Sequence, residues 1–132
     1  MTRKESREKM MQLLFELETS NDFDSETIEN KCKENIRGKE HDRAFAILKA
    51  IAENLNDIDE TINKHSKSWK TSRMPKVDLA VLRLAIGESR YSNDVSKAVV
   101  VSEAINLVKK YSTDNSASFI HGILGAILKD EQ

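Results

Sequence analysis

Positively charged residues gather at the amino end of this sequence, and such a cluster is suited to binding a polyanion. The first eleven residues contain two acids and four cations, which are Arg3, Lys4, Arg7 and Lys9. These cations stand at the start of a predicted helix, where the partial positive charge of the helix end makes each one cost about 0.3–1 kcal/mol at low salt. We therefore expect a negatively charged partner outside the chain to be the reason for the cluster.

A second basic segment lies in the middle of the chain. Residues 64–76 contain no acid, and a cation stands at every third position, at Lys64, Lys67, Lys70, Arg73 and Lys76. Trp69 lies within the segment and offers a flat ring for base stacking. Proteins hold single-stranded nucleic acid with this combination of backbone-binding cations and aromatic faces. The pattern predicts that RNA contacts Lys64, Trp69, Lys70 and Arg73.

Phe119 offers a second aromatic face near a predicted helix start. It follows the polar run TDNSAS at residues 113–118, in which Asn115, Ser116 and free backbone amides could bond base edges or phosphates. The alternative is that Phe119 belongs to the core. The basic segments likewise have an alternative interpretation, as charged surfaces that keep the protein solvated.

Nothing in the sequence indicates catalysis, a cofactor or a metal site. The three histidines are scattered, Cys32 is the single cysteine, and there is no glycine-rich phosphate loop or metal-ligand spacing. A single cysteine forms no internal disulfide, which suits a reducing compartment. The amino end has no secretion signal, and no apolar run approaches the roughly 18 residues of a membrane span. We expect a cytoplasmic binding protein without membrane contact, and not an enzyme.

Apolar residues repeat at helical spacing along most of the 132 residues, which predicts an all-α protein. The predicted helices cover residues 3–18, a segment capped by Asp24 or Ser25 that stops at Gly38, residues 39–64, a segment that begins at Pro75, and residues 96–111 and 116–129, with a helical turn around Trp69. We expect about seven helices in two small bundles that pack into one compact domain over residues 1–132. Residues 1–64 would form a three-helix unit, and residues 65–132 a second helical unit.

Three residues in these helices predict specific packing. Arg83 interrupts the apolar helix that begins at Pro75, and a buried guanidinium needs a carboxylate, for which Glu103 is the candidate. Gly122 and Gly125 each cost about 1 kcal/mol relative to alanine within a helix. We therefore expect another backbone or a ligand to approach closely at these glycines.

Three stretches, taken together and in order, resemble the NusB family of bacterial transcription antitermination factors. They are SREKMMQLLFELE, WKTSRMPKVDLAVLRLAIGES and EAINLVKKYSTDNSASFIHGIL. The resemblance covers nearly the whole chain and implies an all-helical, non-enzymatic RNA-binding protein. It further implies that the protein acts with the ribosomal protein NusE on the boxA element of nascent ribosomal RNA. The implied complex helps RNA polymerase to pass terminators.

The resemblance also implies which residues bind. RNA contacts would lie at the amino end and around the Phe-x-Asn-Gly motif, at Arg3, Lys4, Arg7, Asn115, Ser116 and Phe119. The surface that faces NusE would include Phe15, in a position that is usually tyrosine, and Asp78. The chain departs from the family pattern at His121, which replaces the asparagine of the motif, and at Ser102, where the family commonly has asparagine.

One RNA strand held by all these residues predicts a single groove, in which the amino-terminal cations lie close to Phe119 and to the residues after Ile62. For Arg7, it predicts that alanine weakens RNA binding without lowering the melting temperature. Two other functions stay open: a helical adaptor whose basic segments bind an acidic protein, and the RNA-binding domain of an rRNA methyltransferase. The second would require a cofactor-binding α/β domain, which these 132 residues do not encode.

Overall fold

Helices make up most of the described part of the chain, which is residues 1–131 of this computed structural model. The expected all-α class is confirmed, because these residues form seven helices and no strand. The helices are α1 (Arg3–Ser20), α2 (Ser25–Asn35), α3 (Lys39–Glu53), α4 (Leu55–His65), α5 (Lys76–Tyr91), α6 (Lys97–Tyr111) and α7 (Asp114–Asp130).

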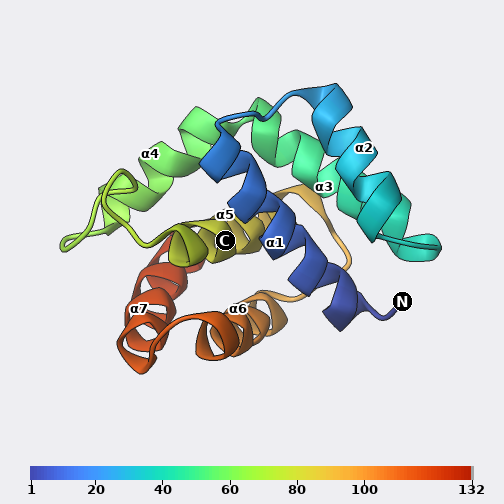
Figure 1. Cartoon of the computed structure of the whole chain (residues 1–132). Helices are drawn as coiled ribbons and strands as arrows, with labels where there is room; N and C mark the ends of the chain where they lie inside the picture. Colours follow the sequence, from blue (N-terminus) through green and yellow to red (C-terminus); the bar gives the residue numbers. More distant parts are fainter. Residues whose placement is uncertain (132) are drawn as a thin grey trace.

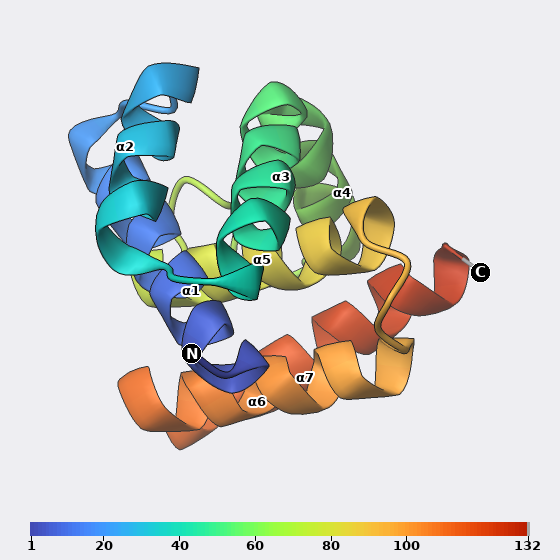
Figure 2. The ribbon, with the colours of Figure 1, turned by 90° about the vertical axis from the view of Figure 1, so that its right-hand side faces the viewer.

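The central element is α5, which the other helices surround. In Figure 1, α1 crosses in front of α5, α6 and α7 lie below it, and α2, α3 and α4 lie above it. Figure 2 shows the same layers from the side. Every residue from Asp78 to Glu88 is buried, as expected for a helix with apolar side chains on more than one side. The helices of both small bundles therefore pack against α5.

The amino end of α1 is fixed by a capping box. The Thr2 hydroxyl accepts a hydrogen bond from the Glu5 backbone amide at 3.0 Å, and the Glu5 carboxylate accepts one from the Thr2 amide at 2.8 Å. These reciprocal bonds satisfy amides that a helix start otherwise leaves unpaired. Arg3 and Lys4 therefore stand on the first turn of an ordered helix.

The single helix predicted over residues 39–64 is wrong, because the chain breaks it at Asn54. The Asn54 backbone has φ −121° and ψ 25°, and its side-chain amide donates to the Ala50 carbonyl at 2.8 Å. An asparagine side chain that bonds the backbone in this way competes with the helical ladder. Beyond the break, α4 packs against α5 and α7. Both α3 and α4 therefore contact α5, and of the two only α4 also packs against α7, while the boundary between residues 64 and 65 stays a prediction.

At Gly122 and Gly125 we expected another backbone or a ligand to approach closely, and the close approach of another helix occurs instead at Gly87. A Cβ atom on Gly87 would overlap Cγ1 and Cδ1 of Ile51, so only glycine allows α5 to approach α3 at this point. A Cβ atom on Gly122 or Gly125 would meet no atom of the described chain within 4 Å. Both residues are exposed on α7, so internal packing does not account for them.

Gly87→Ala is expected to destabilise the protein by about 1–3 kcal/mol, because the added methyl group overpacks the contact between α3 and α5. Gly125→Ala is the matched control. It adds the same methyl group at an exposed helical position, where alanine is favoured over glycine by about 1 kcal/mol. Urea unfolding followed by circular dichroism measures both free energies. If Gly87→Ala were as stabilising as Gly125→Ala, the close contact would not exist in solution.

Candidate nucleic-acid interface

Trp69 and Phe119, which are far apart in the sequence, meet on the surface. Their ring centroids lie 5.5 Å apart, and the rings pack edge to face at 68°. Trp69 lies in the connection between α4 and α5 and is 41% exposed, whereas Phe119 lies in the second turn of α7 and is partly buried. The exposed indole provides the kind of flat surface on which nucleic-acid bases stack.

Hydrogen bonds to the carboxyl end of α4 hold the segment around Trp69. The Lys70 ammonium donates to the backbone carbonyls of Asn63 and Ser66 at 2.9 and 3.2 Å. A cation is favourable there, because the last carbonyls of a helix carry partial negative charge. The helical turn expected around Trp69 lies slightly later, where the Arg73 amide donates to the Lys70 carbonyl at 2.9 Å.

Several cations of this segment are free to meet an outside anion. Lys64, Lys67 and Arg73 are exposed, and among the described residues no carboxylate lies within 4.0 Å of them. Lys76 differs, because its ammonium lies 3.3 Å from the Glu18 carboxylate. The segment therefore presents unpaired positive charge next to an exposed aromatic ring.

His65 contributes little to this charge, because Asp130 balances it. Its Nδ1 faces the Thr61 carbonyl at 2.8 Å, and its Nε2 faces an Asp130 carboxylate oxygen at 2.7 Å. The hydrogen bond with Asp130 raises the pKa of His65 above its usual value, since only the protonated ring donates to both acceptors. The net attraction for an anion therefore comes from the lysines and Arg73.

The first turn of α7 exposes Asn115 and buries Ser116. Thr113 is the N-cap, and its hydroxyl oxygen accepts a hydrogen bond from the Ser116 amide at 3.0 Å. Ser116 is 4% exposed, and its own hydroxyl lies 3.1 Å from those of Ser112 and Thr113. This burial corrects the prediction that Ser116 contacts RNA, because its polar atoms bond inside the protein. Asn115 stays a predicted contact.

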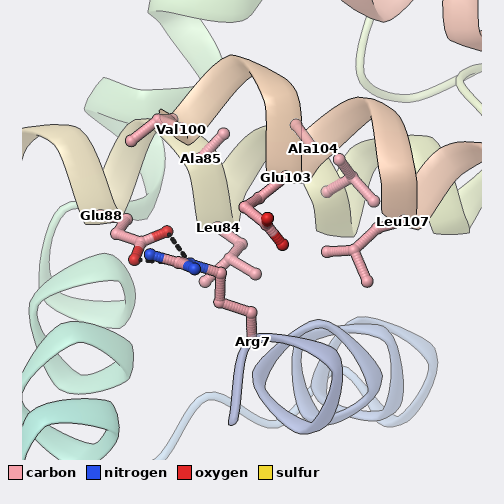
Figure 3. A pocket seen from close by; sticks show the side chains of 9 residues that line it. Arg7, Leu84, Ala85, Glu88, Val100, Glu103, Ala104 and Leu107 are labelled. Carbon is pink, nitrogen blue, oxygen red and sulfur yellow. Dashed lines mark hydrogen bonds and ion pairs between the residues drawn. The ribbon is translucent and has the colours of Figure 1, made fainter. Parts of the chain in front are cut away.

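Arg7 is also buried, which corrects its predicted contact with RNA. It is 6% exposed, and its Nε donates to the two carboxylate oxygens of Glu88 at 3.0 and 2.9 Å. Figure 3 shows the side chain reaching from α1 to Glu88 on α5, beside a cavity of about 10 Å³ that residues of α6 also line. Glu88 accepts a further hydrogen bond from Arg43 of α3 at 2.8 Å. One buried carboxylate therefore ties three helices together.

Arg3 and Lys4 lie at the surface, where acids of the chain face them. Arg3 Nε donates to Glu40 at 2.8 Å, and its Nη1 lies 3.5 Å from Asp94. The pKa of Asp94 is lowered, chiefly by the hydrogen bond from the Arg43 guanidinium, so this acid stays ionised. The Lys4 side chain is 69% exposed, and its ammonium lies 3.7 Å from Glu103. Lys4 is therefore the freer of the two amino-terminal cations.

The two groups of predicted RNA contacts do not form one groove. The amino end of α1 and the connection between α4 and α5 lie on opposite sides of the molecule in Figure 1. Lys4 reaches Glu103 in the middle of α6, and from there α6 continues for about 12 Å before it ends at Tyr111. The expected single groove is wrong, and a strand that meets both groups has to cross α6.

An apolar groove of about 340 Å³ opens between α1, the start of α5 and the end of α6. It is lined by Met11, Gln12, Phe15, Glu16, Val77 and Tyr111. The position of Phe15 fits its predicted role in binding a partner. Asp78 does not, because it is 0% exposed and cannot touch a partner directly. The sequence analysis did not predict that Val77 and Tyr111 line this groove. Val77 directly follows the basic segment 64–76, and Tyr111 directly precedes the polar run 112–118, so an apolar or aromatic side chain beside a polar segment is the signal that could have indicated them.

Arg83 finds its carboxylates on other helices than expected. Its Nε and Nη2 donate to Asp59 of α4 at 3.0 and 2.7 Å, and its Nη1 donates to Glu18 of α1 at 2.6 Å. The predicted partner, Glu103, faces Lys4 instead. Arg83 is 3% exposed, so its role is structural.

The described residues offer binding surfaces and no assembled reactive centre. Among residues 1–131, no group of three or more His, Cys, Asp or Glu side chains is arranged to hold a metal ion. Burial raises the pKa of the Cys32 thiol to about 11. None of the helices described is long and apolar enough to cross a membrane.

Comparison with known proteins identifies the family. The model of the NusB family matches residues 4–129. The chain belongs to the NusB family. It is 44% identical over 131 residues to the transcription antitermination protein NusB of Acetivibrio thermocellus, an alignment that covers 98% of this chain and 90% of that protein.

Solved structures of NusB proteins share the whole fold. T. maritima NusB superposes with a TM-score of 0.88 at 34% identity, which covers 98% of this chain and 92% of that one. A crystal structure of the antitermination factors NusB and NusE in complex with dsRNA superposes with a TM-score of 0.84 at 25% identity, with coverage of 97% and 96%. The resemblance of the three sequence stretches to the NusB family is therefore confirmed.

Arg7→Ala is expected to lower the free energy of unfolding of this NusB-family protein by about 3 kcal/mol, because it leaves a buried carboxylate with one partner fewer. Lys4→Ala is the matched control, since it removes a cation from the same helix turn at an exposed pair, where the change should stay within about 1 kcal/mol. Urea unfolding of both variants measures the difference. Equal stability of the two variants would mean that the Arg7 side chain is free in solution.

Proposed function

We propose that this protein is a transcription antitermination factor that binds the boxA element of nascent ribosomal RNA together with NusE. It acts in the cytoplasm as a binding protein, as part of the elongation complex with RNA polymerase, and not as an enzyme. The family supports this function, and so does the fold shared with a NusB protein that was crystallised with NusE and dsRNA.

The observation that carries the proposal is the exposed Trp69 ring, packed on Phe119, beside cations that no carboxylate of the described chain pairs. Trp69 supplies a stacking face, and Phe119 supports it from α7. Lys64, Lys70 and Arg73 surround the same connection with positive charge that can neutralise phosphates. A base that stacks on Trp69 also comes near the first turn of α7, where Asn115 can bond a base edge.

The amino-terminal cations form a second contact for the same RNA. Lys4 is exposed and weakly paired, so a phosphate can replace Glu103 at little cost. Arg3 can do so only by leaving Glu40 and Asp94, which lie on other elements. A single strand of several nucleotides is long enough to cross α6 between Lys4 and the aromatic pair.

The apolar groove is the proposed surface for NusE. Phe15 lines it together with side chains from α1, α5 and α6, and a groove of about 340 Å³ is large enough to take an apolar side chain of a partner. The groove contains no residue of the RNA-contacting set. The two partners can therefore bind at the same time.

Binding of boxA RNA is expected to depend on salt, because each phosphate contact releases counterions. The slope of log affinity against log salt should be about −0.7 per contact, which gives roughly −2 to −4 for three to five contacts. Filter-binding titrations at several salt concentrations measure it, with a scrambled RNA of the same composition as control. Binding that is insensitive to salt, or equal for both RNAs, would favour the alternative of an adaptor for acidic proteins.

Trp69→Ala is expected to weaken boxA binding by about 1–3 kcal/mol, which is the contribution of one stacked base. Trp69→Phe keeps an aromatic face and should retain most of the affinity. Both variants are compared by the same titration, after circular dichroism has shown an unchanged melting temperature. If Trp69→Phe loses as much affinity as Trp69→Ala, stacking is not the reason for the contact.

Phe15→Ala is expected to weaken NusE binding by about 2 kcal/mol, because it removes an aromatic side chain from the lining of the groove. Phe45→Ala is the control, since Phe45 is a partly buried phenylalanine on α3, which does not line the groove. Calorimetric titration with purified NusE measures both. An equal loss in the two variants would place the NusE surface elsewhere, and RNA binding by the free chain should not change in either.

A further inference from the structure

Asp78 is a buried carboxylate that bonds the connection between α6 and α7. It lies in the first turn of α5 and is 0% exposed. Its Oδ1 accepts a hydrogen bond from the Ser112 hydroxyl at 2.9 Å, in the connection between α6 and α7. Its Oδ2 is buried and has no hydrogen-bond partner in the described chain. The carboxylate is therefore held by this one contact and by the favourable charge of a helix start.

The contact continues through three hydroxyl groups to the first turn of α7. The hydroxyl of Ser112 lies 3.1 Å from that of Ser116, which lies 3.1 Å from that of Thr113. The Ser112 hydroxyl is placed to donate both to Asp78 Oδ1 and to the Ser116 hydroxyl, and the Thr113 hydroxyl also donates to Ser116. The buried carboxylate and the first turn of α7 therefore bond the same Ser112 side chain.

This series ends on the residues that present the RNA contacts. Thr113 is the N-cap of α7, and the Ser116 amide closes its first turn at 3.0 Å. Asn115 stands within that turn, and Phe119 follows one turn later with Trp69 against it. A change in the position of the helix start would move all three of these side chains.

We propose that Asp78 is a positioning residue, which acts through Ser112 and Ser116 to fix the start of α7 and with it the aromatic pair. The inference rests on the proposed RNA-binding function and adds a residue that touches neither RNA nor a partner. It also explains why an acid stands at a fully buried position in the first turn of α5. An apolar residue at position 78 would remove the carboxylate oxygen that accepts from Ser112.

The test compares Asp78→Ala, Asp78→Asn, Ser112→Ala and Asp78→Ala/Ser112→Ala. Asparagine keeps an oxygen that accepts from Ser112, so Asp78→Asn should behave close to the original protein. Ser118→Ala is the control, because Ser118 is an exposed serine of α7 outside the series. Trp69 is the only tryptophan of the chain, so its fluorescence reports the aromatic pair before any RNA is added. Circular dichroism selects the variants that fold, and Ser112→Ala carries the test if Asp78→Ala does not.

We expect Asp78→Ala and Ser112→Ala to shift the emission of Trp69 and to weaken boxA binding by the free chain about fivefold, the effect of one lost hydrogen bond. The double variant should be no weaker than Asp78→Ala, because both changes break the same series. Unchanged Trp69 emission in both single variants would overturn the proposal. So would loss of NusE binding alone, since Asp78 would then be a partner contact. If the original protein binds no boxA RNA, the proposed function fails, while the emission still decides whether Asp78 positions α7.

Discussion

The structure depends on hydrogen-bond and ion-pair partners for the ionic side chains in the buried part of α5. Three ionic residues, Asp78, Arg83 and Glu88, stand five positions apart on α5, so each points about 140° around the helix from the one before it. A buried charge without a partner costs several kcal/mol. Each therefore bonds a partner on a different side of α5. Asp78 bonds the connection between α6 and α7, Arg83 bonds α1 and α4, and Glu88 bonds α1 and α3. These contacts fix the orientation of α5 and hold the surrounding helices in register against it.

The binding surfaces follow from the same arrangement. The amino end of α5 lies between the connection that carries Trp69 and the groove that contains Phe15. Asp78, in its first turn, reaches the start of α7, on which Phe119 supports Trp69. The proposed RNA surface around Trp69 and the groove proposed for NusE are therefore built around one helix start, while the cations of α1 lie across α6. In this proposal, a strand held at both places crosses the α6 side of the molecule.

The sequence predicted the helices well and the partners of charged residues poorly. Helical spacing is a local property, so apolar stripes located five of the seven helices one by one. They merged α3 and α4 into a single helix, because the stripe continues through the break at Asn54. Arg7 was misjudged although its spacing of three from Met10 already placed it on the buried stripe. The partner of Arg83 and the close contact at Gly87 depend on which helix lies opposite, and tertiary packing decides that. Tertiary packing also decides whether a hydroxyl at a helix start faces inward or outward, so the sequence did not show that the Ser116 side chain is buried.

Amide hydrogen exchange of the protein with and without boxA RNA, read by mass spectrometry, tests the central claim most directly. The account predicts slower exchange in three separate segments: the first turn of α1, the connection between α4 and α5, and the first two turns of α7. It predicts no change in α2, which lies away from the proposed path of the strand. Protection confined to the start of α1, or extending over α2 while the Trp69 segment stays unprotected, would contradict it.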